Sequence, residues 1–199
     1  ISTNLSRIDT IKDISEQYQE VFFTVGVHPN EAHKDKQYDD HYFIENYSNH
    51  EKCVGIGEGG LDYYYNMENM KLQKRSLEVQ INVARSTNLP MIIHSRDADN
   101  DMIEILKSEY KNGPFRAILH CFSSGEELAY CGLDLDFFIS FSGILTFNSA
   151  KNIQKIAKNI PLSKILVETD SPYLAPSPVR GSVNEPKNCI HTAKFLSKL

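Results

Sequence analysis

Short apolar runs alternate along the chain with longer stretches in which apolar and polar residues mix. The runs have the length of buried strands and occupy 22–27, 53–57, 91–93, 117–119, 137–140 and 165–167. Helices are expected between them, over 68–86, 101–110, 148–159 and 186–199, and a capping box at Ser123 and Glu126 predicts one more that reaches 130. Gly-rich residues after 57 predict a turn. This alternation is typical of βα units with parallel strands, and thus of an α/β fold.

Four of the apolar runs end in a side chain that binds metals in proteins: Glu58, His94, His120 and Asp170. Parallel strands that form a barrel bring their carboxyl ends to one rim, so we expect these four side chains to converge. Each also fits a bland role, as a loop carboxylate, a core histidine bonded to main-chain carbonyls, or an Asp that caps a turn. The common position at strand ends favours a metal site.

Imidazole and carboxylate ligands together suit Zn, Mn or Mg. Two divalent ions about 3.5–4 Å apart supply what phosphodiester hydrolysis needs, a nucleophilic water near neutral pH and compensation of phosphoryl charge. A carboxylate beside that water can accept its proton, which makes Asp170 the candidate general base. The sequence therefore predicts a hydrolase that uses two divalent ions.

Other residues near the strand ends are candidates for substrate binding. His28 follows the run 22–27 and is expected to contact a substrate phosphate, although it also fits a turn histidine. Arg96, two residues beyond His94, carries the planar fork that binds phosphate, and its structural alternative is a salt bridge with Asp97 or Asp62. The tyrosines at 63–65 fit either packing or stacking on the bases of single-stranded nucleic acid.

Glu168 shares a strand face with Asp170 and is expected to point toward the barrel interior. A carboxylate there is costly unless it is paired. We therefore interpret Glu168 as a supporting residue that orients a histidine or Arg180.

Composition limits the function classes. A chain of 199 residues with 41% hydrophobic and 24% charged residues fits one domain with a sizeable core. A net charge of −5 argues against broad adhesion to phosphate backbones, but a bound cation inverts the field locally, so nucleic acid stays possible as a substrate. The four cysteines have no CxxC spacing and are expected to be reduced. With no apolar run long enough to span a membrane and no secretory pattern, we expect a cytoplasmic protein.

At this point a family resemblance emerges. Successive segments resemble, in order, the signatures of the TatD-type metal-dependent deoxyribonucleases. They are GVHP at 26–29, GIGEGGLDY at 55–63, IIHSR at 92–96, HCFS at 120–123, ISFSG at 139–143 and ETDSPYL at 168–174, continued by RG at 180–181 and NEP at 184–186.

The resemblance implies a TIM barrel of the amidohydrolase type that hydrolyses phosphodiester bonds of DNA, often as an exonuclease. It implies metal ligation by Glu58, His94, His120 and Asp170, with Glu58 bridging two ions and Asp170 holding the attacking water. The tyrosines add the expectation that the DNA is single-stranded. The sequence is silent on oligomeric state.

The chain departs from the family pattern at its ends. It lacks the opening strand with a His-x-His pair, and it ends early. We therefore expect residues 1–199 to be one incomplete barrel domain, without its first strand and its C-terminal end. Two other functions stay open: hydrolysis of a small amide, lactone or phosphate ester on the same barrel, and a non-catalytic truncated barrel that binds a partner.

Overall fold

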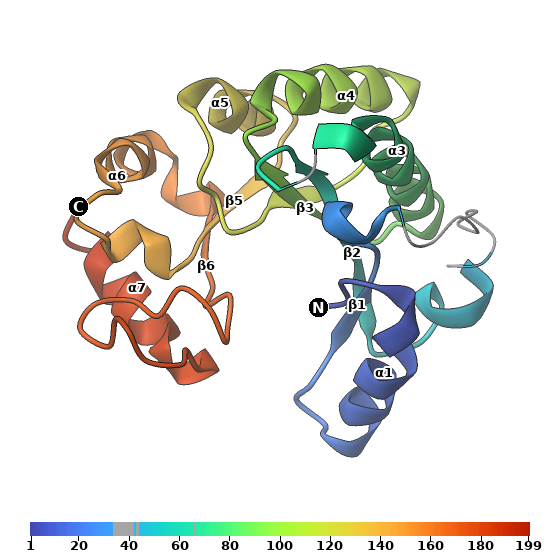
Figure 1. The fold of residues 1–199 in the computed structure, drawn as a ribbon, viewed down its shortest axis with the longest axis horizontal. Coiled ribbons are helices and arrows are strands. Elements are labelled where there is room, and N and C mark those ends of the chain that lie inside the picture. Colours follow the sequence, from blue (N-terminus) through green and yellow to red (C-terminus); the bar gives the residue numbers. More distant parts are fainter. Residues whose placement is uncertain (34–41, 43, 66) are drawn as a thin grey trace. The chain divides into compact units, whose positions relative to one another are not determined.

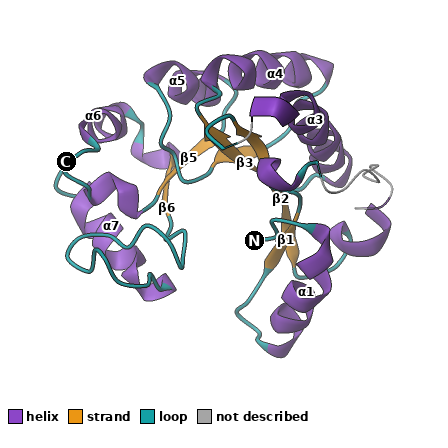
Figure 2. Cartoon of the chain, in the orientation of Figure 1, coloured by secondary structure: helices purple, strands orange, loops and turns teal. Residues whose placement is uncertain are grey.

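A computed structural model describes residues 1–33, 42, 44–65 and 67–199 (Figure 1). The chain divides into two compact units, Ile1–Ile118 and Leu119–Leu199. Helices and strands alternate in both units (Figure 2). No helix among the described residues has the length and apolar character that crossing a membrane requires.

The first unit consists of three paired strands and the helices that connect them. Its elements are α1 (Ile8–Gln17), β1 (Phe23–Val25), β2 (Cys53–Asp62), α3 (Met70–Thr87), β3 (Met91–Arg96) and α4 (Asp99–Asn112), with short helical turns at Leu5–Arg7, Pro29–Glu31, Ile44–Ser48 and Met67–Asn69. β1 pairs with β2 and β2 with β3, both in parallel. These pairings confirm the βα organisation that the sequence predicts.

The second unit continues the alternation. Strand β4 (Ala117–Leu119) lies at the division between the units, followed by α5 (Glu126–Asp134), β5 (Phe138–Phe141), α6 (Lys151–Asn159), β6 (Ile165–Val167) and α7 (Cys189–Leu196), with 3-10 turns at Gly143–Thr146, Leu162–Lys164 and Pro186–Asn188. β5 and β6 pair in parallel, so that the carboxyl ends of both strands lie at the same edge.

The predicted turn after residue 57 is wrong, because β2 continues through the Gly-rich segment to Asp62. Its pairing with β3 is irregular between Ile56 and Gly59 and then regular, with Gly60 opposite His94. Gly60 has a φ of 155°, and a Cβ there would overlap the main-chain oxygen of His94. Glycine is therefore required at Gly60 by close contact between strands and not by a turn.

The predicted helices exist, with shifted ends. One face of α3 is buried, with Leu77, Ile81 and Ala84 on it. The predicted capping box is wrong, because α5 begins at Glu126 with Gly125 at its N-cap and no side-chain cap bond. The final helix is preceded by a separate 3-10 turn that begins at Pro186, and it ends at Leu196.

Candidate functional site

In the first unit, three predicted site residues lie together on β2, on β3 and just after β1. His28 follows β1, while Glu58 lies in β2 and His94 in β3. Oε1 of Glu58 is 3.1 Å from Nε2 of His28 and 3.8 Å from Nδ1 of His94. The two imidazole rings contact edge to face, with centroids 4.5 Å apart. The structure thus brings these three predicted residues together within this unit, and their assigned roles stay a prediction.

Asp62, which the sequence pattern did not indicate, is also a member of this cluster. Its Oδ2 lies 3.4 Å from Nε2 of His94 and accepts a hydrogen bond from the Asn30 side chain at 3.2 Å. Burial disfavours the charged form of Asp62, but the contact with His94, the N–H of Tyr65 and the Asn30 amide together hold the pKa of its carboxyl below the usual value. Asp62 is therefore an anionic group at ion-pair distance from the His94 ring.

A strand that continued past residue 57 would have pointed to Asp62. Asp62 is the carboxylate at the end of β2, directly after the Gly-rich segment. The expected turn after residue 57 obscured this relation. In metal sites, a carboxylate beside the ring nitrogen that does not bind the metal fixes the orientation of the histidine ring.

The proton on His28 can be assigned from its hydrogen bonds. Its Nδ1 accepts the main-chain N–H of Asn30 at 3.1 Å, so the proton of the neutral ring resides on Nε2. That Nε2 faces Glu58 as a donor. A ring nitrogen that carries a proton does not bind a metal, so His28 is suited to donate to an anion.

Two buried glutamines of α3 hold the segments that carry the site. Gln80 clamps the main chain of Val27, accepting its N–H at 3.0 Å and donating to its carbonyl at 3.1 Å. Gln73 clamps Asp62 in the same manner, at 2.8 and 3.0 Å. These residues are seven apart and therefore lie on one helix face. α3 thus fixes the positions of His28 and Asp62, a role that the sequence analysis did not foresee.

In the second unit, His120 lies between two carboxylates that follow β6. Its Nδ1 is 2.8 Å from Oε1 of Glu168, and its Nε2 is 3.7 Å from Oδ1 of Asp170. Ser140 of β5 donates a hydrogen bond to the other oxygen of Glu168 at 2.7 Å. Asp170 has a φ of 59°, a left-handed conformation that Asp adopts more readily than most residues. The interpretation of Glu168 as a residue that orients a histidine agrees with these contacts.

Both units thus contain a histidine between two carboxylates. His94 lies between Asp62 and Glu58, and His120 between Glu168 and Asp170. Ligands about 2.1 Å from a tetrahedral zinc are about 3.4 Å from one another, so the His94–Glu58 and His120–Asp170 separations are close to those of atoms that share a cation. The donor set His120–Glu168–Asp170 lies within 4.8 Å. The residues fit divalent metal in chemistry and in spacing.

The predicted convergence of Glu58 and His94 with His120 and Asp170 joins residues of both units, and it stays a prediction. The structural alternative considered for Arg96 was a salt bridge with Asp97 or Asp62. Among the described residues, no ion pair joins Arg96 to either carboxylate. The guanidinium of Arg96 instead lies over the rings of Tyr64 and Tyr65.

Comparison with known proteins identifies the family of this chain. The model of the family described as TatD related DNase matches residues 1–199. The uncharacterized metal-dependent hydrolase YcfH of Escherichia coli K12 is 39% identical over 199 residues, which cover 100% of this chain and 74% of YcfH. The uncharacterized metal-dependent hydrolase YabD of Bacillus subtilis is 38% identical, over 94% of this chain and 72% of YabD.

Solved structures support the same assignment at the level of the fold. The crystal structure of YjjV, a TatD homolog of Escherichia coli K12, matches with a TM-score of 0.89 at 24% identity, over 99% of this chain and 76% of YjjV. A TatD family hydrolase from Entamoeba histolytica matches with a TM-score of 0.83 at 23% identity, over 99% and 75%. The predicted fold class, an α/β barrel of the TIM type, is confirmed by these matches. With its family model matched along the entire sequence, this chain belongs to the TatD-related DNase family of metal-dependent hydrolases.

Proposed function

We propose that this protein is a deoxyribonuclease that cleaves phosphodiester bonds of DNA, from an end of a single strand, with a metal-activated water. The pairs of carboxylates around His94 and His120 are the observation that carries the proposal. A phosphodiester needs cations held where its charge develops, and these side chains can hold them, although hydrolases of small amides or lactones use a similar ligand set. The family assignment supports nucleic acid as the substrate.

Glu58, His94, His120 and Asp170 would hold two divalent ions, of Zn, Mn or Mg, in this proposal. The bound metal supplies an acidified water and neutralises charge on the phosphoryl oxygens. Asp62 and Glu168 keep the histidine rings oriented, so that Nδ1 of His94 faces Glu58 and Nε2 of His120 faces Asp170. The chain's own contribution to binding is then a preformed set of oriented ligand atoms.

Proton transfer and substrate contacts follow from the same residues. Asp170 accepts the proton of the attacking water, because its carboxylate faces the site beside His120. His28 donates a hydrogen bond from its Nε2–H to a phosphate oxygen, and this bond replaces its contact with Glu58. Arg96 binds a neighbouring phosphate through its guanidinium edge. The cytoplasmic location expected from the sequence stays a prediction.

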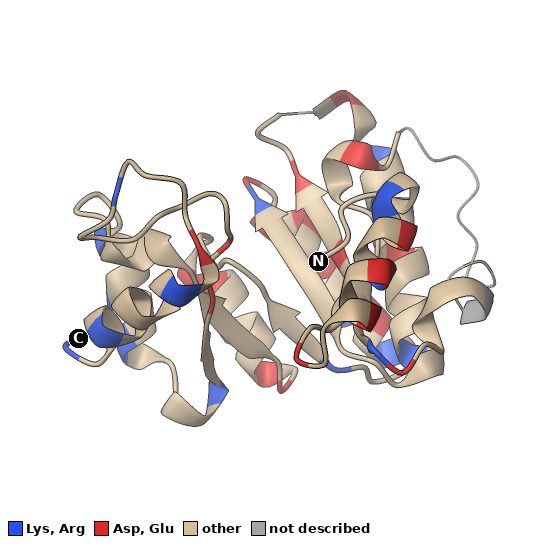
Figure 3. Cartoon of the chain, turned by 90° about the horizontal axis from the view of Figure 1, so that it is seen from below, with Lys and Arg blue, Asp and Glu red and all other residues tan. Residues whose placement is uncertain are grey.

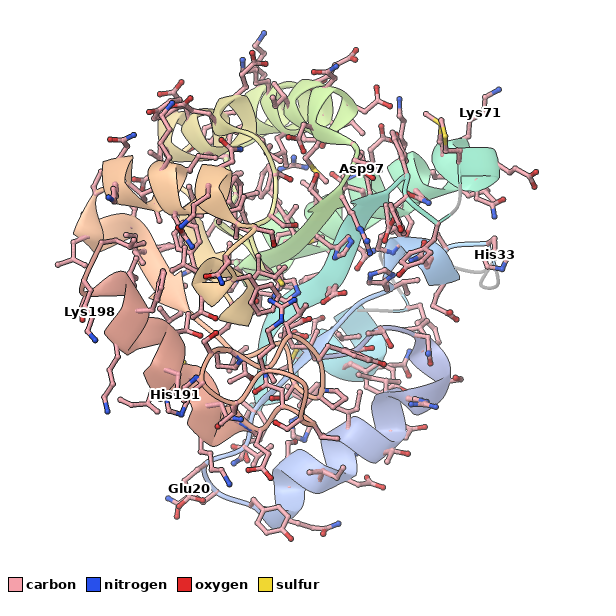
Figure 4. All side chains as sticks on the ribbon, turned by 60° about the vertical axis from the view of Figure 1, so that its left-hand side comes forward. Glu20, His33, Lys71, Asp97, His191 and Lys198 are labelled. Carbon is pink, nitrogen blue, oxygen red and sulfur yellow. The ribbon has the colours of Figure 1, made fainter. Side chains whose placement is uncertain are left out.

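Alanine substitution of His120 or Asp170 tests the proposal. Release of nucleotides from single-stranded DNA with added Mn²⁺ or Mg²⁺ should fall more than about 100-fold, beyond the 10–100-fold that residues outside the ligand set typically cost. His191→Ala is the matched control, because His191 lies in α7 and is not among the proposed ligands or substrate contacts (Figure 4). Wild-type turnover in Asp170→Ala would refute the assigned roles.

The substrate is tested with the same protein. A panel of small amides, lactones and phosphate esters is assayed beside DNA under identical metal conditions. We expect DNA to be cleaved. Cleavage of a small ester with intact DNA would replace the nuclease with the second function considered from sequence, and absence of any metal-dependent turnover would favour a non-catalytic barrel.

A further inference from the structure

Tyr64, Tyr65 and Arg96 form a stacked cluster just beyond His94, here called the rim platform. The Arg96 guanidinium carbon lies 3.8 Å from the ring centroid of Tyr64 and 4.9 Å from that of Tyr65. The two tyrosine rings contact edge to face, with centroids 4.7 Å apart. A cation–π contact at these distances restrains the planar fork of Arg96 and leaves its in-plane N–H donors available.

The backbone beneath the rim platform is fixed by the site itself. Oδ1 of Asp62 accepts the main-chain N–H groups of Tyr64 and Tyr65 at 3.0 and 3.3 Å. The main-chain N–H of Tyr63 donates to the Arg96 carbonyl at 2.9 Å, which ties the tyrosine turn to the end of β3. The carboxylate beside His94 therefore also positions the main chain of the two platform tyrosines.

The rings are exposed, and packing does not explain them. Tyr64 is 58% exposed and Tyr65 67% exposed, whereas the adjacent Tyr63 is anchored by a hydrogen bond from its hydroxyl to Asp101. Two neighbouring aromatic rings with so much open surface bury little apolar area in the fold. Single exposed aromatic residues are ordinary, but a pair joined to a cation offers stacking faces and an anion donor in one place.

The position of the platform suits a substrate strand that reaches the site. In the pairing of β2 with β3, Gly60 is opposite His94 and Asp62 is opposite Arg96. Arg96 is thus about 7 Å beyond His94 along the strand, at about 3.3 Å per residue. A substrate strand bound at His94 can therefore reach the platform without a long gap.

We propose that the rim platform binds single-stranded DNA next to the metal site, with a base stacked on Tyr65 and a phosphate bound by Arg96. The proposal rests on the nuclease function above and adds how the strand is held. A single strand is favoured over duplex because its bases present free faces to an aromatic ring. Basic and acidic positions are interspersed in the view of Figure 3, and Asp97, labelled in Figure 4, follows Arg96 directly. Charge alone is therefore a weak attraction here, and stacking has to contribute.

Binding of two fluorescent oligomers of equal length tests the platform without turnover. One is oligothymidylate and the other is an abasic oligomer, which keeps the phosphates and lacks the bases. Both are titrated by anisotropy with a chelator present, so that hydrolysis does not interfere. Tyr65→Ala should weaken oligothymidylate binding by about five- to 150-fold, the range typical of one lost stacking contact, and should leave the abasic oligomer nearly unchanged. Tyr65→Phe, which keeps the ring, is the matched control and should bind as the wild type does.

Arg96→Gln separates the phosphate contact from stacking. It should weaken binding of both oligomers and lower the salt dependence of log K by about 0.7, the value expected for one lost phosphate contact on a single strand. Unchanged oligothymidylate binding in Tyr65→Ala, an equal loss for the abasic oligomer, or no binding by the wild type would each overturn the platform. Because the assay needs no hydrolysis, these outcomes are independent of whether the protein proves to be a nuclease.

Discussion

Replacement of Gln80 by Leu tests whether α3 holds the segment after β1, which carries Val27 and His28. Gln80 is buried, and its amide satisfies both the N–H and the carbonyl of Val27, the residue before His28. Leu has nearly the volume of Gln, so the change removes hydrogen bonds without opening a large cavity. A Cβ at Gly26 or Gly59 would lie 2.6 Å from the amide of Gln80, so the surroundings leave little room for a water to take its place.

The expected loss of unfolding free energy follows from the two main-chain groups of Val27 that lose their hydrogen-bond partner. A buried donor or acceptor without a hydrogen bond costs about 1–3 kcal/mol, so the pair at Val27 costs about 2–6 kcal/mol. Single domains are stable by about 5–15 kcal/mol, so the variant should retain its fold with a large loss. At an m-value of about 2 kcal/mol/M, the urea midpoint should fall by about 1–3 M.

The measurement is urea unfolding followed by circular dichroism, with hydrogen exchange of the peptide that contains Val27 as the local readout. Glu78→Leu is the matched control, because Glu78 is exposed on the same helix and should shift the midpoint little. Gln73→Leu, which removes the equivalent clamp at Asp62, should destabilise to a similar extent. A Gln80→Leu midpoint equal to that of the wild type would refute the clamp.

Two other substitutions address the second unit and the region beneath the rim platform. Glu168→Gln should lower metal affinity about 10–100-fold in a competition titration, because it removes the carboxylate 2.8 Å from Nδ1 of His120. Glu185→Gln is the control. An affinity equal to that of the wild type would contradict the orienting role of Glu168. Tyr63→Phe removes a 2.6 Å bond to Asp101 and should cost about 1 kcal/mol of unfolding free energy. Hydrogen bonds from Lys74 and then Tyr63 lower the pKa of Asp101. The difference in unfolding free energy between the wild type and Tyr63→Phe should therefore be full above pH 4 and vanish as pH falls through that lowered pKa. A difference that is independent of pH would contradict this reasoning.

The strands were predictable where apolar runs are short and sharply bounded. The structure places β4 and β6 at the predicted 117–119 and 165–167, where polar residues follow at once. β2 was predicted too short, because a Gly-rich sequence is typical of a turn. Its glycines instead permit close approach to β3 and α3, and such tertiary contacts leave no local signal.

The candidate ligands were predictable from their position, and their partners were not. Glu58, His94, His120 and Asp170 follow or end apolar runs, a feature visible in sequence. Gln73 and Gln80 are polar residues of an amphipathic helix, and such residues usually face solvent. Only the packed structure shows that they satisfy main-chain groups at Val27 and Asp62, since the partners are distant in sequence.

The contacts of the two histidines bear on the structural alternative considered for them. A histidine with a purely structural role needs only a main-chain carbonyl, which carries no net charge. His94 is instead adjacent to Asp62, a carboxylate that is 1% exposed and whose charge the N–H donors of Asn30, Tyr64 and Tyr65 compensate. Each further carboxylate beside the same ring, Glu58 at His94 and Asp170 at His120, adds negative charge that a neutral imidazole does not balance. A divalent cation balances it, and the same acidic, histidine-rich pairs that are expensive without metal become its ligands.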